Sequence, residues 1–379
     1  MKLRIGIAGL GSIGKNHARI LAELPDCELA AVFDTDANTT REIAEKYGTR
    51  AVGSLEEFAE GIEAATIATP TPTHFAIAEQ LLKAGKHLLV EKPITETTQD
   101  ARKLVELSQQ AGRILQVGHV ERFNPVMSKL EELLTRPRFI EVHRLSPYPN
   151  RSIEIGVVLD LMIHDLEIIL HLVRSPVKSI DAVGVPVLSR GEDIATVRLH
   201  FQNGCVANVT ASRISPEKQR KIRVFQREGY VSLDYQNQTG EICRLAGGRL
   251  VREEVPIEKD EPLKLELAAF VECARQGKQP KVSGFEGSAA LELAVEITRR
   301  IEEHAASIQV LRKNSKFEIR NSKCLARRRR ALRGYSLRAA ASNISNFSFN
   351  ETLSRRGRSQ RGCAGGGVDP VFARAAGGD

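Results

Sequence analysis

The chain has 379 residues, enough for two or three domains with hydrophobic cores of their own. Its formal net charge is +8, but residues 311–379 hold 16 of the 55 Lys and Arg and only 4 of the 47 Asp and Glu. The remaining 39 basic and 43 acidic residues make residues 1–310 slightly acidic, which excludes a basic nucleic-acid-binding body.

The six cysteines are scattered, with no C-x-x-C pair and no histidine at metal-ligand spacing. This pattern indicates neither a zinc site nor a disulfide framework, and reduced thiols are typical of the cytoplasm. The N-terminus leads directly into a predicted strand without a signal-peptide pattern, and no apolar run reaches the ~20 residues of a membrane span. We therefore expect a soluble, cytoplasmic protein without a metal.

A glycine-spaced turn follows the first predicted strand, residues 3–8. In a dinucleotide-binding unit, a glycine such as Gly9 allows the turn and Gly11 lets a pyrophosphate approach the backbone. Gly14 lets the next helix pack against the strand, and Ser12 and Ile13 stand at the helix N-terminus that faces the phosphates. The sequence predicts an NAD site here.

Asp34 ends the second predicted strand, 20 residues after Gly14. An acid at this separation meets the ribose hydroxyls of a dinucleotide and repels a 2′-phosphate, which favours NAD over NADP. The alternative is an ordinary strand-to-helix turn with a solvated aspartate at the strand end.

Strands and helices alternate as far as residue 117, which predicts a parallel, doubly wound Rossmann sheet covered by helices. We expect strands near 51 and at 64–68, 87–90 and 114–117, and helices at 37–47, from 55, at 75–84 and up to 110. Pro70 and Pro72 should exclude helix and keep residues 69–74 extended. That segment lies at the carboxyl edge of the sheet, where ligands of such sheets bind.

Strands dominate after Gly118, which predicts a second, α+β domain with a mainly antiparallel sheet. Strands are expected at 140–145, 177–185, 194–201, 204–212, 221–226 and 230–234, with a hairpin over 245–251. Helices at 262–276 and 283–304 close the fold, the last packing back on the first domain. Residues 311–379 are typical of a disordered basic tail, for which nucleic-acid or anionic-membrane binding is the alternative to no specific role.

Two stretches carry candidate chemistry. Lys92, in Glu91-Lys92-Pro93, ends a parallel strand at the expected cofactor edge, where its ammonium can hold an oxygen. A predicted helix over 157–172 places a stripe of polar side chains on an otherwise apolar surface: Asp160, His164, Glu167 and His171. Asp160 can orient His164 as a general base, or the whole stripe can be structural. A metal site is not favoured, because no further ligands complete a coordination sphere. Asp165 lies off the stripe and needs a partner of its own.

Together these motifs resemble the Gfo/Idh/MocA family of NAD(P)-dependent oxidoreductases. The resemblance covers about residues 1–305 and rests on Gly9-x-Gly11-x-x-Gly14 with His17, Thr69-Pro70-x-x-x-His74, Glu91-Lys92-Pro93 and Asp160-x-x-x-His164. It implies a Rossmann domain at 1–120, a substrate-binding and oligomerisation domain with a large open sheet at 121–305, and hydride transfer at a sugar or cyclitol hydroxyl carbon. Lys92 matches the family's active-site lysine, His164 its catalytic histidine and Asp160 the preceding acid, while Gly156 alone remains of the usual double glycine.

The stretch from Gly118 to Pro125 is similar to family members that oxidise the 3-hydroxyl of UDP-N-acetylglucosamine. Arg122 and Asn124 are the expected sugar or diphosphate contacts, with three further arginines as phosphate candidates: Arg144, Arg151 and Arg213. The predicted function is NAD-dependent oxidation of a nucleotide sugar by a homodimer or homotetramer. Oxidation of a free sugar or inositol, and an NAD-binding regulator without turnover, are the alternatives.

Overall fold

The computed structural model describes residues 2–148, 155–227 and 229–313 of the chain. Residues 1–311 form one compact unit. The predicted tail beyond residue 313 lies outside the described residues, as does Arg151. Within the described part, no helix carries an apolar stretch long enough to cross a membrane.

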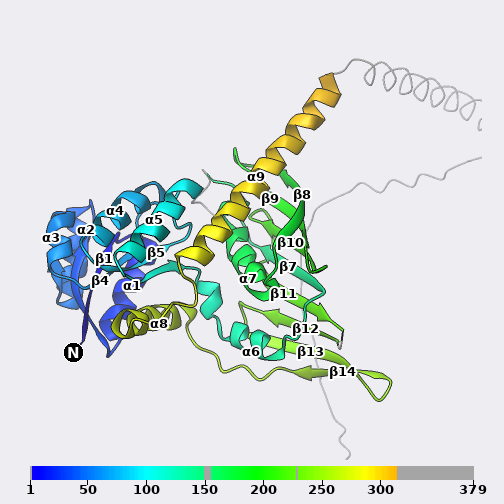
Figure 1. Ribbon diagram of the computed structural model, residues 1–379, viewed down its shortest axis with the longest axis horizontal. Coiled ribbons are helices and arrows are strands. Elements are labelled where there is room, and N and C mark those ends of the chain that lie inside the picture. The colour runs from blue at the N-terminus through cyan, green and yellow to red at the C-terminus, as the bar shows by residue number, and fades with distance from the viewer. Residues whose placement is uncertain (1, 149–154, 228, 314–379) are drawn as a thin grey trace, which may run out of the picture. The chain divides into compact units, whose positions relative to one another are not determined.

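The N-terminal domain is built on a parallel sheet whose strand order is β3-β2-β1-β4-β5-β6 (Figure 1). Its strands are β1 (Leu3–Ala8), β2 (Cys27–Phe33), β3 (Arg50–Ala51), β4 (Ala64–Ile67), β5 (His87–Glu91) and β6 (Leu115–Gly118). This is the order of a doubly wound dinucleotide-binding sheet, in which the chain reverses between β1 and β4. The predicted Rossmann fold is confirmed.

The connections between these strands are helical. They are α1 (Ser12–Glu23), α2 (Ala37–Tyr47), α3 (Leu55–Glu60), α4 (Thr71–Lys83) and α5 (Thr98–Gln110). One prediction was wrong: α4 begins at Thr71 and not at Phe75. Pro72 lies in the first turn, where a backbone N–H has no acceptor within the helix, so its missing donor costs nothing there.

The second domain contains a larger sheet with the order β14-β13-β12-β11-β7-β10-β9-β8. Its strands are β7 (Phe139–Leu145), β8 (Val177–Val185), β9 (Ile194–Phe201), β10 (Val206–Ser212), β11 (Gln219–Gln226), β12 (Gly229–Asp234), β13 (Thr239–Ala246) and β14 (Arg249–Glu254). Neighbouring strands are antiparallel except β7 and β10, which pair in parallel. The predicted mainly antiparallel sheet is confirmed.

Alternation along the strands gives this sheet one buried face. In β9, Ala195, Val197 and Leu199 are buried, whereas Thr196 and Arg198 are exposed. The buried face shares a hydrophobic core with four helical segments. They are α6 (Pro125–Leu133), a π-helical turn labelled η2 (Val158–Met162), α7 (Ile163–Val173) and part of α9 (Gly284–Lys313).

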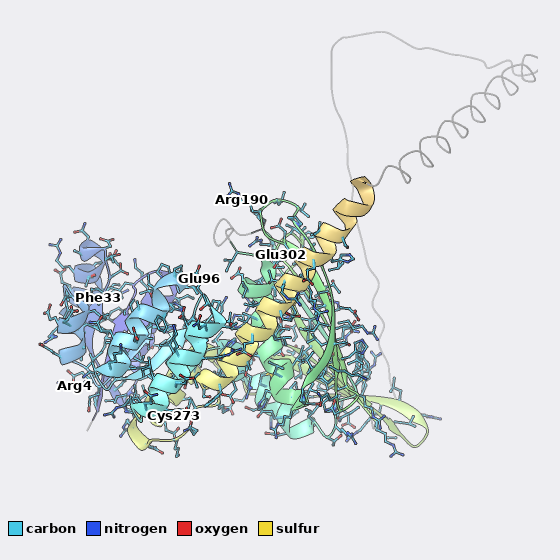
Figure 2. The ribbon with its side chains drawn as sticks, turned by 45° about the horizontal axis from the view of Figure 1, so that its top comes forward. Arg4, Phe33, Glu96, Arg190, Cys273 and Glu302 are labelled. Carbon is cyan, nitrogen blue, oxygen red and sulfur yellow. The ribbon has the colours of Figure 1, made fainter. Side chains whose placement is uncertain are left out.

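The last two helices return to elements that precede the sheet. Buried residues of α8 (Pro262–Gln276), including Leu267, Phe270 and Cys273, join the core formed by β1 and α1. Figure 2 shows Cys273 on this helix, within the N-terminal domain. The helix α9 starts against β6, where the Gly287 backbone approaches Val117, and then runs along the second sheet. It ends at Lys313, nine residues later than expected.

Candidate active site

The glycine turn after β1 has the geometry of a phosphate cradle. Gly9 has φ +93°, and a Cβ on Gly14 would lie 1.9 Å from the Gly9 carbonyl oxygen, so a side chain is excluded at both positions. A Cβ on Gly11 would meet nothing within 4 Å, which leaves open space beside the turn. Gly11 is also the N-cap of α1, and no side chain caps that end of the helix. The N–H groups of the first turn therefore remain available to an anion, as NAD pyrophosphate requires.

Asp34 connects the end of β2 to the glycine turn. Its Oδ2 atom accepts a hydrogen bond from the Leu10 N–H at 2.6 Å, and its Oδ1 atom accepts one from the Asp36 N–H at 2.9 Å. A carboxylate offers about four acceptor positions, and the Thr35 hydroxyl also donates to Oδ1, at 3.4 Å, so one position remains, on Oδ2, for a ribose hydroxyl. Ile13, a predicted cofactor contact at the helix N-terminus, is 41% exposed. These residues fit a bound dinucleotide.

His74 links two loops at the carboxyl edge of the sheet. Its Nδ1 atom lies 2.9 Å from the Pro93 carbonyl oxygen and its Nε2 atom 2.9 Å from that of Thr69. The ring is buried. His74, a predicted cofactor contact, therefore holds the Thr69-Pro70 segment against the loop that contains Lys92. Thr69 is half-buried and Pro70 is exposed at that edge.

Lys92 joins the two domains. It directly follows β5, and its Nζ atom donates to the backbone oxygen of Asp160 at 2.6 Å and to the Oδ1 atom of Asp160 at 3.3 Å. Both side chains are about one-fifth exposed. The structure thus brings together two residues that the sequence analysis placed in the catalytic group and that are 68 positions apart.

The predicted helix over 157–172 is not one regular α-helix. Residues 158–162 form the π turn η2, and α7 begins at Ile163. The expected bond between Asp160 and His164 is absent among the described contacts: Asp160 pairs with Lys92, and the His164 Nδ1 atom is buried without a partner. A helical wheel of 3.6 residues does not apply across a π turn, and an ammonium is a stronger partner for a carboxylate than a neutral imidazole.

The rest of the polar stripe is structural. Glu167 accepts a hydrogen bond from the Arg122 guanidinium at 2.8 Å, and both side chains are buried. His171 lies 2.9 Å from a carboxylate oxygen of Glu131. These contacts agree with the alternative that the stripe satisfies neighbouring elements.

The proposed substrate contacts Arg122 and Asn124 are both buried within the second domain. Asn124 accepts a hydrogen bond from the Val126 N–H at the start of α6 and donates one to the Tyr235 carbonyl oxygen. Both side chains are buried in contacts within the protein, so neither presents a polar group to a ligand. We therefore leave both out of the proposed substrate site.

Arg144 and Arg213, two of the phosphate candidates, also form buried ion pairs. Arg144 donates to both carboxylate oxygens of Asp165, at 2.6 and 2.9 Å, and to Glu121 at 3.0 Å. This confirms that Asp165 has a partner of its own. Arg213 donates to Asp193 at 2.8 Å, and both of these side chains are fully buried.

His164 is held without charge. Burial lowers its pKa well below the usual range, and the positive charges of Lys92 and Arg144 add to that effect. The imidazole is therefore neutral at pH 7, the form that accepts a proton. His119 packs against it with 5.6 Å between ring centroids and 84° between ring planes, and burial lowers the pKa of His119 to about 3.

A buried acidic cluster behind Lys92 was missed by the sequence analysis. Glu266 on α8 is fully buried, and neither of its carboxyl oxygens has a hydrogen-bond partner among the described residues. Burial raises the pKa of Glu266 well above its usual range, and the charge of Glu91 raises it further. Glu91 in turn lies 3.2 Å from the Nε2 atom of buried His17. The sequence feature that could have revealed Glu266 is its position between Leu265 and Leu267 in an apolar part of the predicted helix.

No group of three or more His, Cys, Asp or Glu side chains in the described ranges is arranged to hold a metal ion.

Comparison with known proteins identifies the family. Residues 3–119 match the description "Oxidoreductase family, NAD-binding Rossmann fold", and residues 131–232 match "GFO/IDH/MocA C-terminal domain". The chain is 34% identical over 307 residues to a UDP-N-acetylglucosamine 3-dehydrogenase of Acidithiobacillus ferrooxidans, an alignment that covers 79% of this chain and 97% of the relative.

The chain belongs to the Gfo/Idh/MocA oxidoreductase family. A solved structure of the Acidithiobacillus ferrooxidans enzyme superposes with a TM-score of 0.77 and covers 80% of this chain and 98% of that one. A myo-inositol 2-dehydrogenase of Thermotoga maritima is 28% identical over 324 residues, covering 79% of this chain and 97% of the relative. The protein is thus an NAD-binding dehydrogenase of a family whose members act on sugar and cyclitol hydroxyls.

Two substitutions in the glycine turn should separate folding from cofactor binding. Gly11→Ala adds a methyl group in open space at φ −66°, so we expect an unchanged melting temperature and NAD affinity weakened at least about tenfold. Gly14→Ala forces a clash with the Gly9 carbonyl and should lower the melting temperature. Thermal unfolding and calorimetric titration with NAD measure both; equal NAD affinity in Gly11→Ala would contradict the cradle.

Glu266→Gln should stabilise the protein progressively as the pH rises. The folded protein keeps the Glu266 proton, whereas the unfolded chain loses it above about pH 4.5, so wild-type stability falls with pH in this window. The glutamine variant has no such loss. The difference in free energy of unfolding should therefore grow between pH 5 and pH 8, by at most about 1.4 kcal/mol per pH unit.

Urea denaturation at several pH values measures this difference. Glu272→Gln, a more exposed position on the same helix, is the matched control and should show no such trend. A constant difference for Glu266→Gln would mean that Glu266 is ionised in the folded protein.

Proposed function

We propose that the protein oxidises a ring hydroxyl of a nucleotide sugar, with the 3-hydroxyl of UDP-N-acetylglucosamine as the first candidate, and uses NAD⁺ as hydride acceptor. The observation that carries this proposal is the contact between Lys92 and Asp160. It ties the lysine at the cofactor edge of the first sheet to the helical segment that carries neutral His164. An amine and an unprotonated imidazole beside a nicotinamide site are the groups that alcohol oxidation needs.

His164 acts as the general base in this proposal. Its Nδ1 atom is buried, so Nε2 is the ring nitrogen that can reach a substrate hydroxyl and take its proton. Lys92 holds the same oxygen with its ammonium and stabilises the negative charge that develops there. Asp160 supports the reaction by fixing the Lys92 side chain and has no direct role in orienting His164.

The cofactor is held by the first domain. The open backbone at Gly11, Ser12 and Ile13 binds the pyrophosphate, and Asp34 binds the adenosine ribose. The remaining acceptor position on the Asp34 Oδ2 atom favours a ribose hydroxyl, and the negative charge disfavours the 2′-phosphate of NADP. NAD⁺, when bound, supplies the site that accepts the hydride.

The nucleotide-sugar substrate is supported by identity to the Acidithiobacillus ferrooxidans enzyme and by the stretch from Gly118 to Pro125. The similarity to a myo-inositol dehydrogenase supports the competing substrate class. A regulator without turnover has no use for a neutral imidazole beside Lys92, which argues against that alternative. A homodimer or homotetramer and a cytoplasmic location remain predictions; the four described cysteines are free and buried.

A panel of substrates tests the proposal. UDP-N-acetylglucosamine, UDP-glucose, N-acetylglucosamine and myo-inositol are each supplied with NAD⁺ or NADP⁺, and reduced cofactor is followed by absorbance. We expect the highest kcat/KM for UDP-N-acetylglucosamine with NAD⁺. Turnover of myo-inositol alone would show that the protein is a cyclitol dehydrogenase. No turnover of any compound would support the alternative of an NAD-binding regulator.

Substitutions at the two proposed catalytic residues should act on turnover and spare cofactor binding. We expect Lys92→Ala and His164→Ala each to lower kcat by about 10²- to 10⁴-fold, because each removes a group that acts in the transition state. The NAD dissociation constant should change by less than about threefold. His171→Ala, on the same helix but paired with Glu131, is the matched control. Wild-type kcat in either variant removes that residue from the mechanism.

A further inference from the structure

His119 is a buried imidazole with no hydrogen bond to its ring. It directly follows β6 and is 1% exposed. Its backbone N–H donates to the Val117 carbonyl oxygen, but neither ring nitrogen has a partner among the described residues. Buried polar atoms in proteins are nearly always partnered, and a histidine in such a position calls for a physical reason.

The neighbour of this ring is His164. The two ring planes are 84° apart, so the edge of one imidazole points at the face of the other. The His164 Nδ1 atom is also buried, and no described residue bonds to it. An edge-to-face contact lets a polarised N–H or C–H group meet a π face, an attraction that a count of hydrogen bonds does not include.

Among the residues that the structure describes, no carboxylate fixes the Nδ1 atom of His164. A carboxylate normally accepts the Nδ1 proton, but Asp160 is bonded to Lys92 and Asp165 to Arg144. His119 comes from the other domain: it directly follows β6, which pairs with β5, and Lys92 directly follows β5.

We propose that His119 is the positioning residue of His164: its ring fixes the orientation of the His164 imidazole by edge-to-face packing and closes the Nδ1 side of that ring to water. The inference rests on the proposed function, in which His164 is the general base. It assigns to His119 a role that acts through the His164 ring and needs no contact of its own with substrate or cofactor.

The charges around His164 explain why exclusion of water matters. Lys92 after β5, Arg144 on β7 and Arg220 on β11 are all cations whose fields act on this imidazole. The acids nearest in the chain, Asp160 and Asp165, already neutralise Lys92 and Arg144. His119 adds no charge, because burial and Lys92 keep its own pKa near 3. Water on the Nδ1 side would stabilise a protonated His164 and remove the base.

The test measures His164 directly, in the full chain and without substrate. Histidine labelled with ¹³C at Cε1 is titrated by NMR, and the His164 signal is assigned from its loss in His164→Gln. In His119→Ala, which opens the Nδ1 side, we expect the His164 pKa to rise by about one unit. In His119→Phe, which keeps a ring there, we expect a rise of less than about 0.3 units.

Turnover of the substrate found by the panel gives the second readout. His119→Ala should lower kcat about tenfold and move the acidic limb of its pH profile upward, while KM for NAD⁺ stays constant. His119→Phe should keep kcat within about threefold of wild type.

Either of two results overturns the inference. An unchanged His164 titration in His119→Ala would show that the ring does not protect it. Equal damage in His119→Phe and His119→Ala would show that the nitrogens of His119 act directly. The titration needs no turnover, so the two failures are distinguishable. A protein that is inactive on every substrate but shows the expected His164 pKa change in His119→Ala contradicts the proposed function and not this inference.

Discussion

The contact between the Lys92 ammonium and Asp160 is the interaction on which the proposed active site depends. It spans two domains with different sheets, and it is the point at which the cofactor edge of the Rossmann sheet meets the π turn before α7. A lysine that is four-fifths buried needs an anionic or carbonyl partner, and Asp160 supplies both a backbone oxygen and a carboxylate. The position of the amine is therefore set by the fold before any ligand binds.

The buried ionisable groups in the rest of the molecule fall into two classes: those that lie against an opposite charge and those that burial keeps neutral. Deep in the second domain, buried arginines lie against acids: Arg144 against Asp165 and Glu121, Arg213 against Asp193, and Arg122 against Glu167, whose pKa burial raises to about 8. Close to Lys92, burial lowers the pKa of His164 and His119 and raises that of Glu266, so all three groups are neutral. Paired charges maintain the fold, whereas neutral titratable groups are free to exchange protons, and perturbed groups of this kind are typical of functional sites.

Local patterns were sufficient to predict the fold, whereas the roles of Lys92, Asp160 and His164 remain proposals. The apolar strands and the glycine spacing predict the Rossmann sheet because their causes are local: a turn that requires Gly9 and a close approach that requires Gly14. The start of α4 was wrong because a proline was treated as a helix breaker without regard to its position in the first turn. Proline disrupts a helix in its interior, and Pro72 lies in the first turn, where it is tolerated.

The partners of polar side chains were not predictable from spacing. Asp160 and His164 are four residues apart, yet Asp160 is bonded to a lysine 68 positions away, and the π turn that contains Asp160 was not predicted from the sequence. Arg122 and Asn124 looked available for a ligand because their partners Glu167 and Tyr235 are distant in the chain. His119 and Glu266 escaped notice because only tertiary packing makes them buried and unpartnered.

A crystal structure of the protein with NADH and UDP-N-acetylglucosamine tests the central claim most directly. The account predicts that the Lys92 Nζ and His164 Nε2 atoms both lie within hydrogen-bond distance of one sugar hydroxyl, the one whose carbon faces the nicotinamide C4 atom. A bound sugar whose reacting hydroxyl is contacted by other side chains, with His164 turned away from it, would contradict the account.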